Sequence, residues 1–61
     1  MAKPRRGDSL DLTIDALAFG GEGIGRVDGY VIFVRGAVPG DRARVKVTEA
    51  RARYGRGVVE S

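Results

Sequence analysis

Arginine side chains give this sequence its clearest chemical potential, and they are concentrated in one half of the chain. Residues 35–61 carry seven Lys or Arg side chains against three carboxylates, and six of the seven are arginines. A guanidinium group pairs with a phosphate through parallel N–H donors and also stacks on the plane of a base. The net charge of the whole chain is only +3, so the asymmetry, more than the total, indicates a polyanionic partner.

Two aromatic side chains lie beside glycines, in segments where a ring can be reached by an unpaired base. Phe19 precedes a pair of glycines and Tyr54 precedes Gly55. A base stacked on such a ring contributes ~1–3 kcal/mol, and lysine and arginine add a salt-dependent attraction to phosphates. Each cation taken alone is most simply a solvated charge, but the cluster together with Tyr54 favours a nucleic-acid-binding surface. The candidate binding residues are Phe19, Arg26, Arg35, Arg42, Arg44, Lys46, Arg51, Arg53, Tyr54 and Arg56.

Catalytic chemistry has little support in the residue types present. The chain has no His and no Cys, and its hydroxyls and carboxylates are scattered without a nucleophile beside a base. The glycine cluster fails the phosphate-loop pattern, because Arg26 and Val27 follow Gly25 where Lys and Ser or Thr are required. Cation-binding loops also gather carboxylates more tightly than this chain does. We therefore expect no catalytic residue, no metal and no cofactor.

The length of 61 residues allows one small domain. At this size only ~60% of the unfolded surface is buried on folding, and neither a disulfide nor a zinc site is available for support. No apolar run reaches the ~18 residues that a membrane span needs. Polar residues at 8, 9 and 11 interrupt the start where a signal peptide would be apolar. We expect a cytoplasmic monomer without membrane contact, or a fragment of a longer protein.

The elements that must position the candidate residues are strands. Residues 9–17 alternate between apolar and polar types, which is typical of a strand with one face in the core. Residues 42–49 alternate in the same way and place Arg42, Arg44 and Lys46 on one outer face. The outer face of residues 9–17 is acidic, so we expect it to point away from a nucleic acid.

A glycine-rich hairpin joins these two strands and organises the fold. Residues 18–29 contain a short strand, and the Asp-Gly pair at 28–29 predicts a two-residue hairpin turn. Residues 30–35 are apolar on both faces, which predicts an enclosed strand with Phe33 in the core. Residues 38–41, Val-Pro-Gly-Asp, predict a type II turn. Phe19, before this hairpin, either seals one end of the fold or is exposed.

The complete pattern predicts an all-β fold. Five short strands are separated by turn signals, with a last strand over residues 54–60, and no segment has helical periodicity. Such a pattern is typical of a small barrel. Residues 1–8 are basic and nearly free of apolar side chains, so we expect a disordered arm there and a domain over residues 9–61. The arm is either a solubilising tail or a weak phosphate contact.

Four segments together resemble a known family, the TRAM domain. They read GGEGIGR at 20–26, GYVIFV at 29–34, GAVPGD at 36–41 and YGRG at 54–57. The arrangement is most similar to the N-terminal TRAM domain of bacterial 23S rRNA and tRNA uracil-5-methyltransferases. The resemblance implies a five-stranded OB-like barrel that binds RNA and presents it to a catalytic domain elsewhere in the parent enzyme.

The catalytic features of that family are not carried over to this chain. Its S-adenosylmethionine site, catalytic cysteine and iron–sulfur ligands have no counterpart here. Similar TRAM domains also occur in radical methylthiotransferases and as small archaeal proteins, which leaves the parent enzyme open. A second hypothesis is a protein-interaction or spacer module that packs on a catalytic domain and touches RNA little. The acidic outer face of residues 9–17 and the modest net charge motivate that hypothesis.

Overall fold

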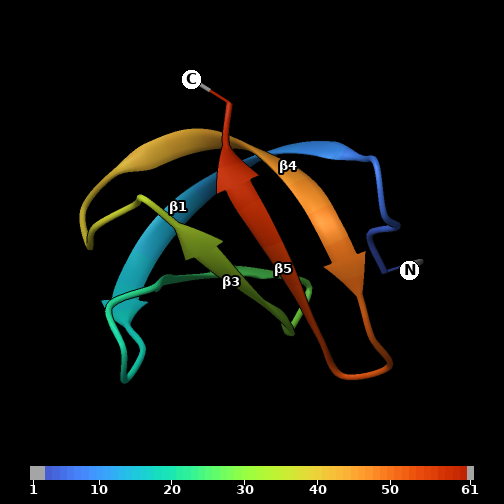
Figure 1. Cartoon of the computed structure of the whole chain (residues 1–61), viewed down its shortest axis with the longest axis horizontal. Coiled ribbons are helices and arrows are strands. Elements are labelled where there is room, and N and C mark those ends of the chain that lie inside the picture. The colour runs from blue at the N-terminus through green and yellow to red at the C-terminus, as the bar shows by residue number, and fades with distance from the viewer. Residues whose placement is uncertain (1–2, 61) are drawn as a thin grey trace.

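The computed structural model describes residues 3–60, which form a closed five-stranded barrel. Residues 1–2 of the predicted arm and residue 61 of the predicted domain lie outside this range. The order around the barrel is β1-β2-β3-β5-β4, and β4 pairs with β1 to close it (Figure 1). The strands are β1 (Ser9–Leu17), β2 (Gly23–Val27), β3 (Tyr30–Arg35), β4 (Arg42–Ala50) and β5 (Tyr54–Val59). The predicted all-β barrel is therefore confirmed.

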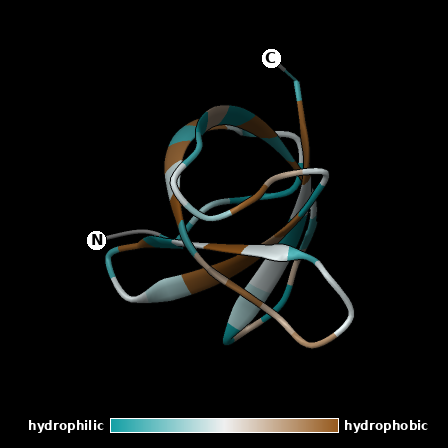
Figure 2. Cartoon of the chain, turned by 90° about the vertical axis from the view of Figure 1, so that its left-hand side faces the viewer, coloured by the Kyte–Doolittle hydropathy of each residue, from teal (hydrophilic) through white to brown (hydrophobic). Residues whose placement is uncertain are grey.

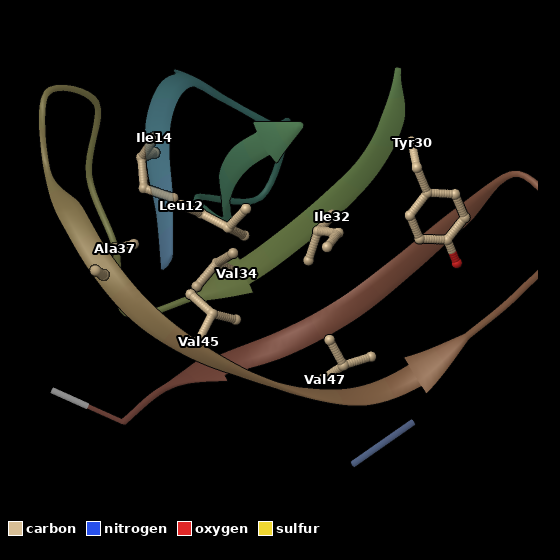
Figure 3. Close-up of a cluster of buried hydrophobic side chains, with 9 residues drawn as sticks. Leu12, Ile14, Tyr30, Ile32, Val34, Ala37, Val45 and Val47 are labelled. Atoms are coloured by element: carbon tan, nitrogen blue, oxygen red, sulfur yellow. The ribbon is translucent and has the colours of Figure 1, made fainter. Parts of the chain in front are cut away.

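Alternate side chains of β1, β3 and β4 fill the interior, as the period of two predicts. All pairs of neighbouring strands are antiparallel except β3 and β5, which run parallel. Figure 3 shows the core side chains converging between the strands. The buried apolar residues are Leu12, Ile14, Tyr30, Ile32, Val34, Ala37, Ala43, Val45 and Val47. Within residues 3–60, no helix is long and apolar enough to cross a membrane.

Strands β2 and β5 contribute glycines to the inner face, and these glycines allow close approach of the barrel walls. A Cβ atom added at Gly57 would lie 2.8 Å from the carbonyl oxygen of Lys46. One added at Gly23 would lie 2.9 Å from the carbonyl oxygen of Ala37. Both distances are shorter than van der Waals contact permits, so a side chain at either position would push the backbone walls apart. The glycine clusters therefore have a packing role.

Both predicted turns are present. Asp28 and Gly29 have φ angles of 50° and 81°, and two positive φ angles in a two-residue loop are typical of the type I′ hairpin turn. In the turn over residues 38–41, the Asp41 N–H donates to the Val38 carbonyl at 3.1 Å. Gly40 has φ of 96°, as a type II turn requires at its third position. The turn leads directly into β4, in which Ala43, Val45 and Val47 are buried and the cations between them are exposed.

The connections divide between the two ends of the barrel. One end holds the β1–β2 loop, residues 18–22, and the β3–β4 loop, residues 36–41; it lies at the left in Figure 1. The other end holds the β2–β3 turn and the β4–β5 loop, residues 51–53. The N-terminal residues reach this second end, at the right of the same view. Cations of the N-terminal arm and of the β4–β5 loop therefore meet at this end.

The described part of the N-terminal arm, residues 3–8, is hydrogen-bonded to β4, in contrast to the disorder that its composition predicts. The Gly7 N–H donates to the Val47 carbonyl at 2.8 Å, and the Val47 N–H donates to the Asp8 carbonyl at 2.8 Å. Pro4 is buried. A turn at Gly7, where φ is 96°, brings these residues back along the strand. Composition missed this contact because it depends on backbone pairing, which side-chain polarity does not reveal.

Candidate nucleic-acid interface

An aromatic pair lies on the outer face where β3 and β5 run side by side. Since Ile32 and Val34 point into the barrel, the residue between them, Phe33, points outward and is only half-buried. Its ring lies 5.8 Å from the ring of Tyr54, centroid to centroid, at an interplanar angle of 72°. The prediction that Phe33 lies in the core is therefore wrong. A run that is apolar on both faces hides the alternation that would have shown its direction.

A guanidinium group covers both rings. Arg56 lies opposite Phe33 in the parallel pairing of β3 with β5. Its Cζ atom is 5.7 Å from the ring centroid of Phe33 and 5.8 Å from that of Tyr54. Both distances fall within the range of a cation–π contact. Phe33, Tyr54 and Arg56 are called the platform below, because they form one outward surface with two apolar rings and one planar cation.

Two carboxylates hold the Arg56 guanidinium in place. Its Nη1 atom lies 3.2 Å from Oε1 and Oε2 of Glu22, and its Nε atom lies 3.8 Å from Oε1 of Glu49. The second oxygen of Glu49 accepts a hydrogen bond from Nε of Arg51. That hydrogen bond and the charge of Glu49 raise the pKa of Arg51 above its ordinary value. The network links the β1–β2 loop to the β4–β5 loop across the platform.

A buried tyrosine fixes the β4–β5 loop from inside the barrel. The hydroxyl of Tyr30 donates to the carbonyl oxygen of Arg51 at 2.8 Å and also contacts the carbonyl oxygen of Tyr54. The Arg51 N–H donates to the same Tyr54 carbonyl at 2.8 Å. Tyr30 is 8% exposed, so water competes little for these bonds. The loop that carries Arg51 and Arg53 therefore has a defined path beside the platform.

Further cations surround the platform without a carboxylate partner. Arg35 and Lys46 lie on either side of Val58 in the pairing of β3, β5 and β4. Arg53 is exposed in the β4–β5 loop. Among residues 3–60, none of these three side chains forms an ion pair. Their charges are thus free to attract phosphates to the edges of the platform.

The N-terminal arm adds basic residues that the candidate set did not include. Arg6 and Arg51 line an open depression at the end of β4, together with Thr48, Glu49 and Ala50. The Nζ atom of Lys3 donates to the Arg51 carbonyl at 3.3 Å. The basic composition of the arm was the available signal. Its position beside the β4–β5 loop depends on the turn at Gly7 and could not be read from composition.

Three of the predicted cations lie beside β1, away from the platform, and two of them pair with carboxylates of β1. Arg44 is paired with Asp11 across the β1–β4 ladder, with 3.5 Å between Nη2 and Oδ2. Arg42 lies opposite Thr13 in the same ladder. Nη1 of Arg26, on β2, lies 2.7 Å from Oδ1 of Asp15. The acidic face of β1 thus approaches part of the predicted basic surface, and the structure divides the candidate set.

Among residues 3–60, Phe19 is the most exposed large apolar side chain. It lies in the β1–β2 loop with a relative exposure of 108%, at the end of the barrel opposite the β4–β5 loop. It therefore does not seal the barrel, and it does not join the platform.

Between Lys3 and Glu60, no group of three or more His, Cys, Asp or Glu side chains is placed to hold a metal ion. The chemistry that this geometry offers is stacking and ion pairing.

Comparison with known proteins identifies the family. The family model described as the TRAM domain matches residues 3–59. The chain belongs to the TRAM domain family. The resemblance seen in its glycine and Pro-Gly motifs is thereby confirmed, and the match includes the described part of the N-terminal arm.

Similar TRAM domains occur in longer proteins. The chain is 48% identical over 54 residues to ribosomal RNA large subunit methyltransferase E of Natronomonas pharaonis, covering 88% of this chain and 21% of the relative. It is 44% identical over 55 residues to an uncharacterized RNA methyltransferase of Thermosynechococcus vestitus, covering 90% of this chain and 12% of the relative. The chain thus spans only about a fifth or less of the length of such curated relatives.

A solved structure shares the fold. The solution structure of a conserved protein of Methanococcus maripaludis superposes with a TM-score of 0.87 at 33% identity. The match covers 93% of this TRAM domain and 81% of that chain. The similarity therefore extends over most of both proteins and supports the five-stranded barrel fold.

Proposed function

We propose that this TRAM domain is an RNA-binding accessory domain of an RNA methyltransferase and that it holds RNA on the β3–β5 face. The outward platform carries this proposal, because two rings and a guanidinium lie together with unpaired cations beside them. Relatives that carry similar domains are named as RNA methyltransferases. The sequence has no His and no Cys, so we assign methyl transfer to another part of the parent enzyme.

The chemistry of the platform favours single-stranded or locally opened RNA. Stacking on Phe33 and Tyr54 needs a base whose face is free, and bases in loops, bulges and single strands meet this condition. Arg35 and Lys46 would then contact phosphates on one side of the stacked base, and Arg53 would contact them near the β4–β5 loop. Contacts of this kind with RNA phosphates give an affinity that falls as the salt concentration rises. Stacking and phosphate contact together hold the strand without reading its sequence.

The finer assignment concerns the parent enzyme. We place the domain in a uracil-5-methyltransferase of ribosomal or transfer RNA, on the resemblance of residues 20–41 and 54–57 to that group. Two relatives are named as ribosomal RNA large subunit methyltransferases, which supports ribosomal RNA as the ligand. A tRNA methylthiotransferase is the alternative parent. The cysteine-free composition is in keeping with our further proposal of a monomeric domain in the cytoplasm.

A titration followed by NMR tests the RNA-binding proposal. The ¹⁵N-labelled chain is mixed with an unstructured oligoribonucleotide of about ten nucleotides at low salt. We expect amide shifts at Phe33, Tyr54, Arg56 and residues 51–53, and much smaller shifts in β1. A duplex RNA of equal length serves as the control and should bind more weakly. Shifts that are absent, or that are confined to β1 and the adjacent part of β4, would refute the β3–β5 face as the binding surface.

A second candidate function is docking on the remainder of a longer methyltransferase chain. Leu17, Phe19 and Val38 are 54%, 108% and 55% exposed, and all belong to the end of the barrel formed by the β1–β2 and β3–β4 connections. Figure 2 views this end and shows hydrophobic segments in both loops. Because matched relatives are five to eight times longer than the matched segment, we propose the rest of such a chain as the partner of this apolar end.

Capture of the parent catalytic region by the isolated domain tests the docking candidate. The double substitution Phe19→Ser and Val38→Ser should abolish capture and leave RNA affinity unchanged. The triple substitution Arg44→Ala, Lys46→Ala and Arg53→Ala should leave capture unchanged. Capture that disappears on ribonuclease treatment would instead reveal an RNA bridge and refute direct docking.

A further inference from the structure

The carboxylates beside the platform are more enclosed than those of the other ion pairs. Side chains of Glu22 and Glu49 are 29% and 33% exposed. The carboxylates that pair with Arg26 and Arg44 are 49% and 53% exposed. Water screens an exposed pair strongly and an enclosed pair less. The two glutamates therefore act on the platform guanidinium more strongly than surface position alone suggests.

These glutamates also occupy the donors that a phosphate would use. A guanidinium group binds an oxyanion best through a pair of neighbouring N–H groups. In the free domain, Nη1 of Arg56 donates to the two oxygens of Glu22 at 3.2 Å, while its Nε lies at ion-pair distance from Glu49, 3.8 Å, too far for a hydrogen bond. Glu49 additionally holds Arg51. A phosphate can therefore bind Nη1 of Arg56 or Nε of Arg51 only when the carboxylate leaves that donor.

We propose that Glu22 and Glu49 are internal competitors for phosphate, which leave Arg56 and Arg51 when RNA binds. This inference rests on the proposed function and concerns the same surface. Exchange of one oxyanion for another gains little by itself, because the bonds broken resemble the bonds formed. Net affinity then comes from a base stacked on one ring of the platform. The two glutamates thereby restrict the site to ligands that carry both a phosphate and an exposed base.

The restriction predicts discrimination between RNA and polyanions that have no bases. Heparin can supply oxyanions to Arg56 but cannot stack on the platform, so it does not recover the cost of displacing the glutamates. Neutral glutamine at either position keeps the size and the acceptor oxygen of the side chain but removes the negative charge. The variants should therefore bind both ligands more tightly, by a similar factor, because the same carboxylate no longer has to be displaced.

Binding measurements on Glu22→Gln and Glu49→Gln test this proposal. Dissociation constants are measured by fluorescence anisotropy for a single-stranded oligoribonucleotide and by competition for heparin, at low salt. We expect each variant to bind RNA about fivefold more tightly than the wild type, as the loss of one nearby charge implies, and to bind heparin more tightly by a similar factor. The matched control is Glu60→Gln, which makes the same charge change at the end of β5 and should alter either affinity less than twofold.

The outcomes separate this proposal from the function on which it rests. If the wild type binds RNA but neither glutamine variant binds more tightly than Glu60→Gln, the glutamates do not compete with phosphate. If the wild type does not bind RNA, the proposed function itself fails. An NMR measurement on the wild type tests the same exchange without requiring that a variant folds. The side-chain Nε–H resonance of Arg56 should shift on addition of RNA, and an unchanged resonance at saturation would overturn the exchange.

Discussion

The β3–β5 face and the β1–β4 face of this barrel both carry arginine–carboxylate pairs, yet they differ in what lies under the guanidinium. On the β3–β5 face, Arg56 covers the rings of Phe33 and Tyr54 and is held by two carboxylates. On the β1–β4 face, Arg44 meets Asp11 at 3.5 Å, and both side chains are 53% exposed. A count of cations therefore does not define an interface. Strand register defines the interface, because it decides which cations lie over aromatic rings.

The largest expected effect comes from a substitution in the barrel interior, beneath the two faces. Gly57→Ala, under the β3–β5 face, would place a Cβ atom 2.8 Å from a backbone carbonyl, which cannot move without opening the β4–β5 ladder. We expect a loss of about 3 kcal/mol in the free energy of unfolding, at the upper end of the usual cost of overpacking. A domain of this length has a total of only roughly 3–9 kcal/mol. Urea denaturation gives the value.

Gly25→Ala is the matched control, under the part of the barrel where β2 meets β1. Its added Cβ atom would meet side-chain atoms of Leu12 at 3.2 and 3.3 Å, and a leucine can adjust. We expect a loss of about 1 kcal/mol, at the low end of the overpacking range. Equal losses at the two glycines would show that the wall below the platform is not the more tightly packed one.

The ring of Phe33 sets the next largest expected effect. Phe33→Ala should weaken binding of a single-stranded oligoribonucleotide about tenfold or more, because one stacked base contributes ~1–3 kcal/mol. Phe33→Tyr keeps the ring and should bind within about twofold of the wild type, since an added hydroxyl leaves the stacking face intact. Thermal melting of both variants checks the fold. Full affinity in the alanine variant would remove the distinction between the two faces.

Salt dependence distinguishes the cations of the two faces. Lys46→Ala should lower the slope of log affinity against log salt by ~0.7, the value for one phosphate contact to a single strand. Arg44→Ala should leave the slope nearly unchanged, because this arginine lies over the acidic strand β1. Anisotropy titrations between about 50 and 200 mM salt, a range that resolves such slopes, provide the measurement. A larger change in the Arg44 variant would move the binding surface to the β1–β4 face.

The ion pair of the β1–β4 face should give the smallest effect. Asp11→Asn removes the charge opposite Arg44, and exposed pairs contribute only ~0–1 kcal/mol. We expect the free energy of unfolding to fall by less than about 0.5 kcal/mol. RNA affinity should change less than twofold. Urea denaturation and anisotropy test both values, and a loss above about 1 kcal/mol would mean that this face is more than a solvated surface.

The backbone of this fold was largely predictable from the sequence. Alternation located β1 and β4, and the Asp-Gly and Pro-Gly pairs located the turns, because both signals arise from local geometry. The bounds of β3, residues 30–35, follow directly from the apolar run between two turns. Strand β2 was the least defined, since its glycines carry no alternation. Local chemistry therefore determines where the strands lie in the sequence.

The composition of the candidate site was less predictable, because it depends on which strands become neighbours. Parallel pairing of β3 with β5 places Arg56 beside Phe33, and nothing local to either strand specifies this register. The alternation of side chains along β3 was a usable signal. Phe33 lies two residues before the charged Arg35 and therefore on the same outward face. The pairing of β1 with β4 likewise brought Asp11 to Arg44. Charge patterns along one strand cannot reveal such partners.

Closure of the barrel has a consequence for how this domain can be reused. Each strand has two hydrogen-bonded neighbours, because β4 returns to pair with β1. An open sheet edge is a template for pairing with foreign strands, and a closed barrel avoids that hazard in any host. A unit of this kind is portable between polypeptides, which gives a physical reason for its occurrence as 21% of one relative and 12% of another.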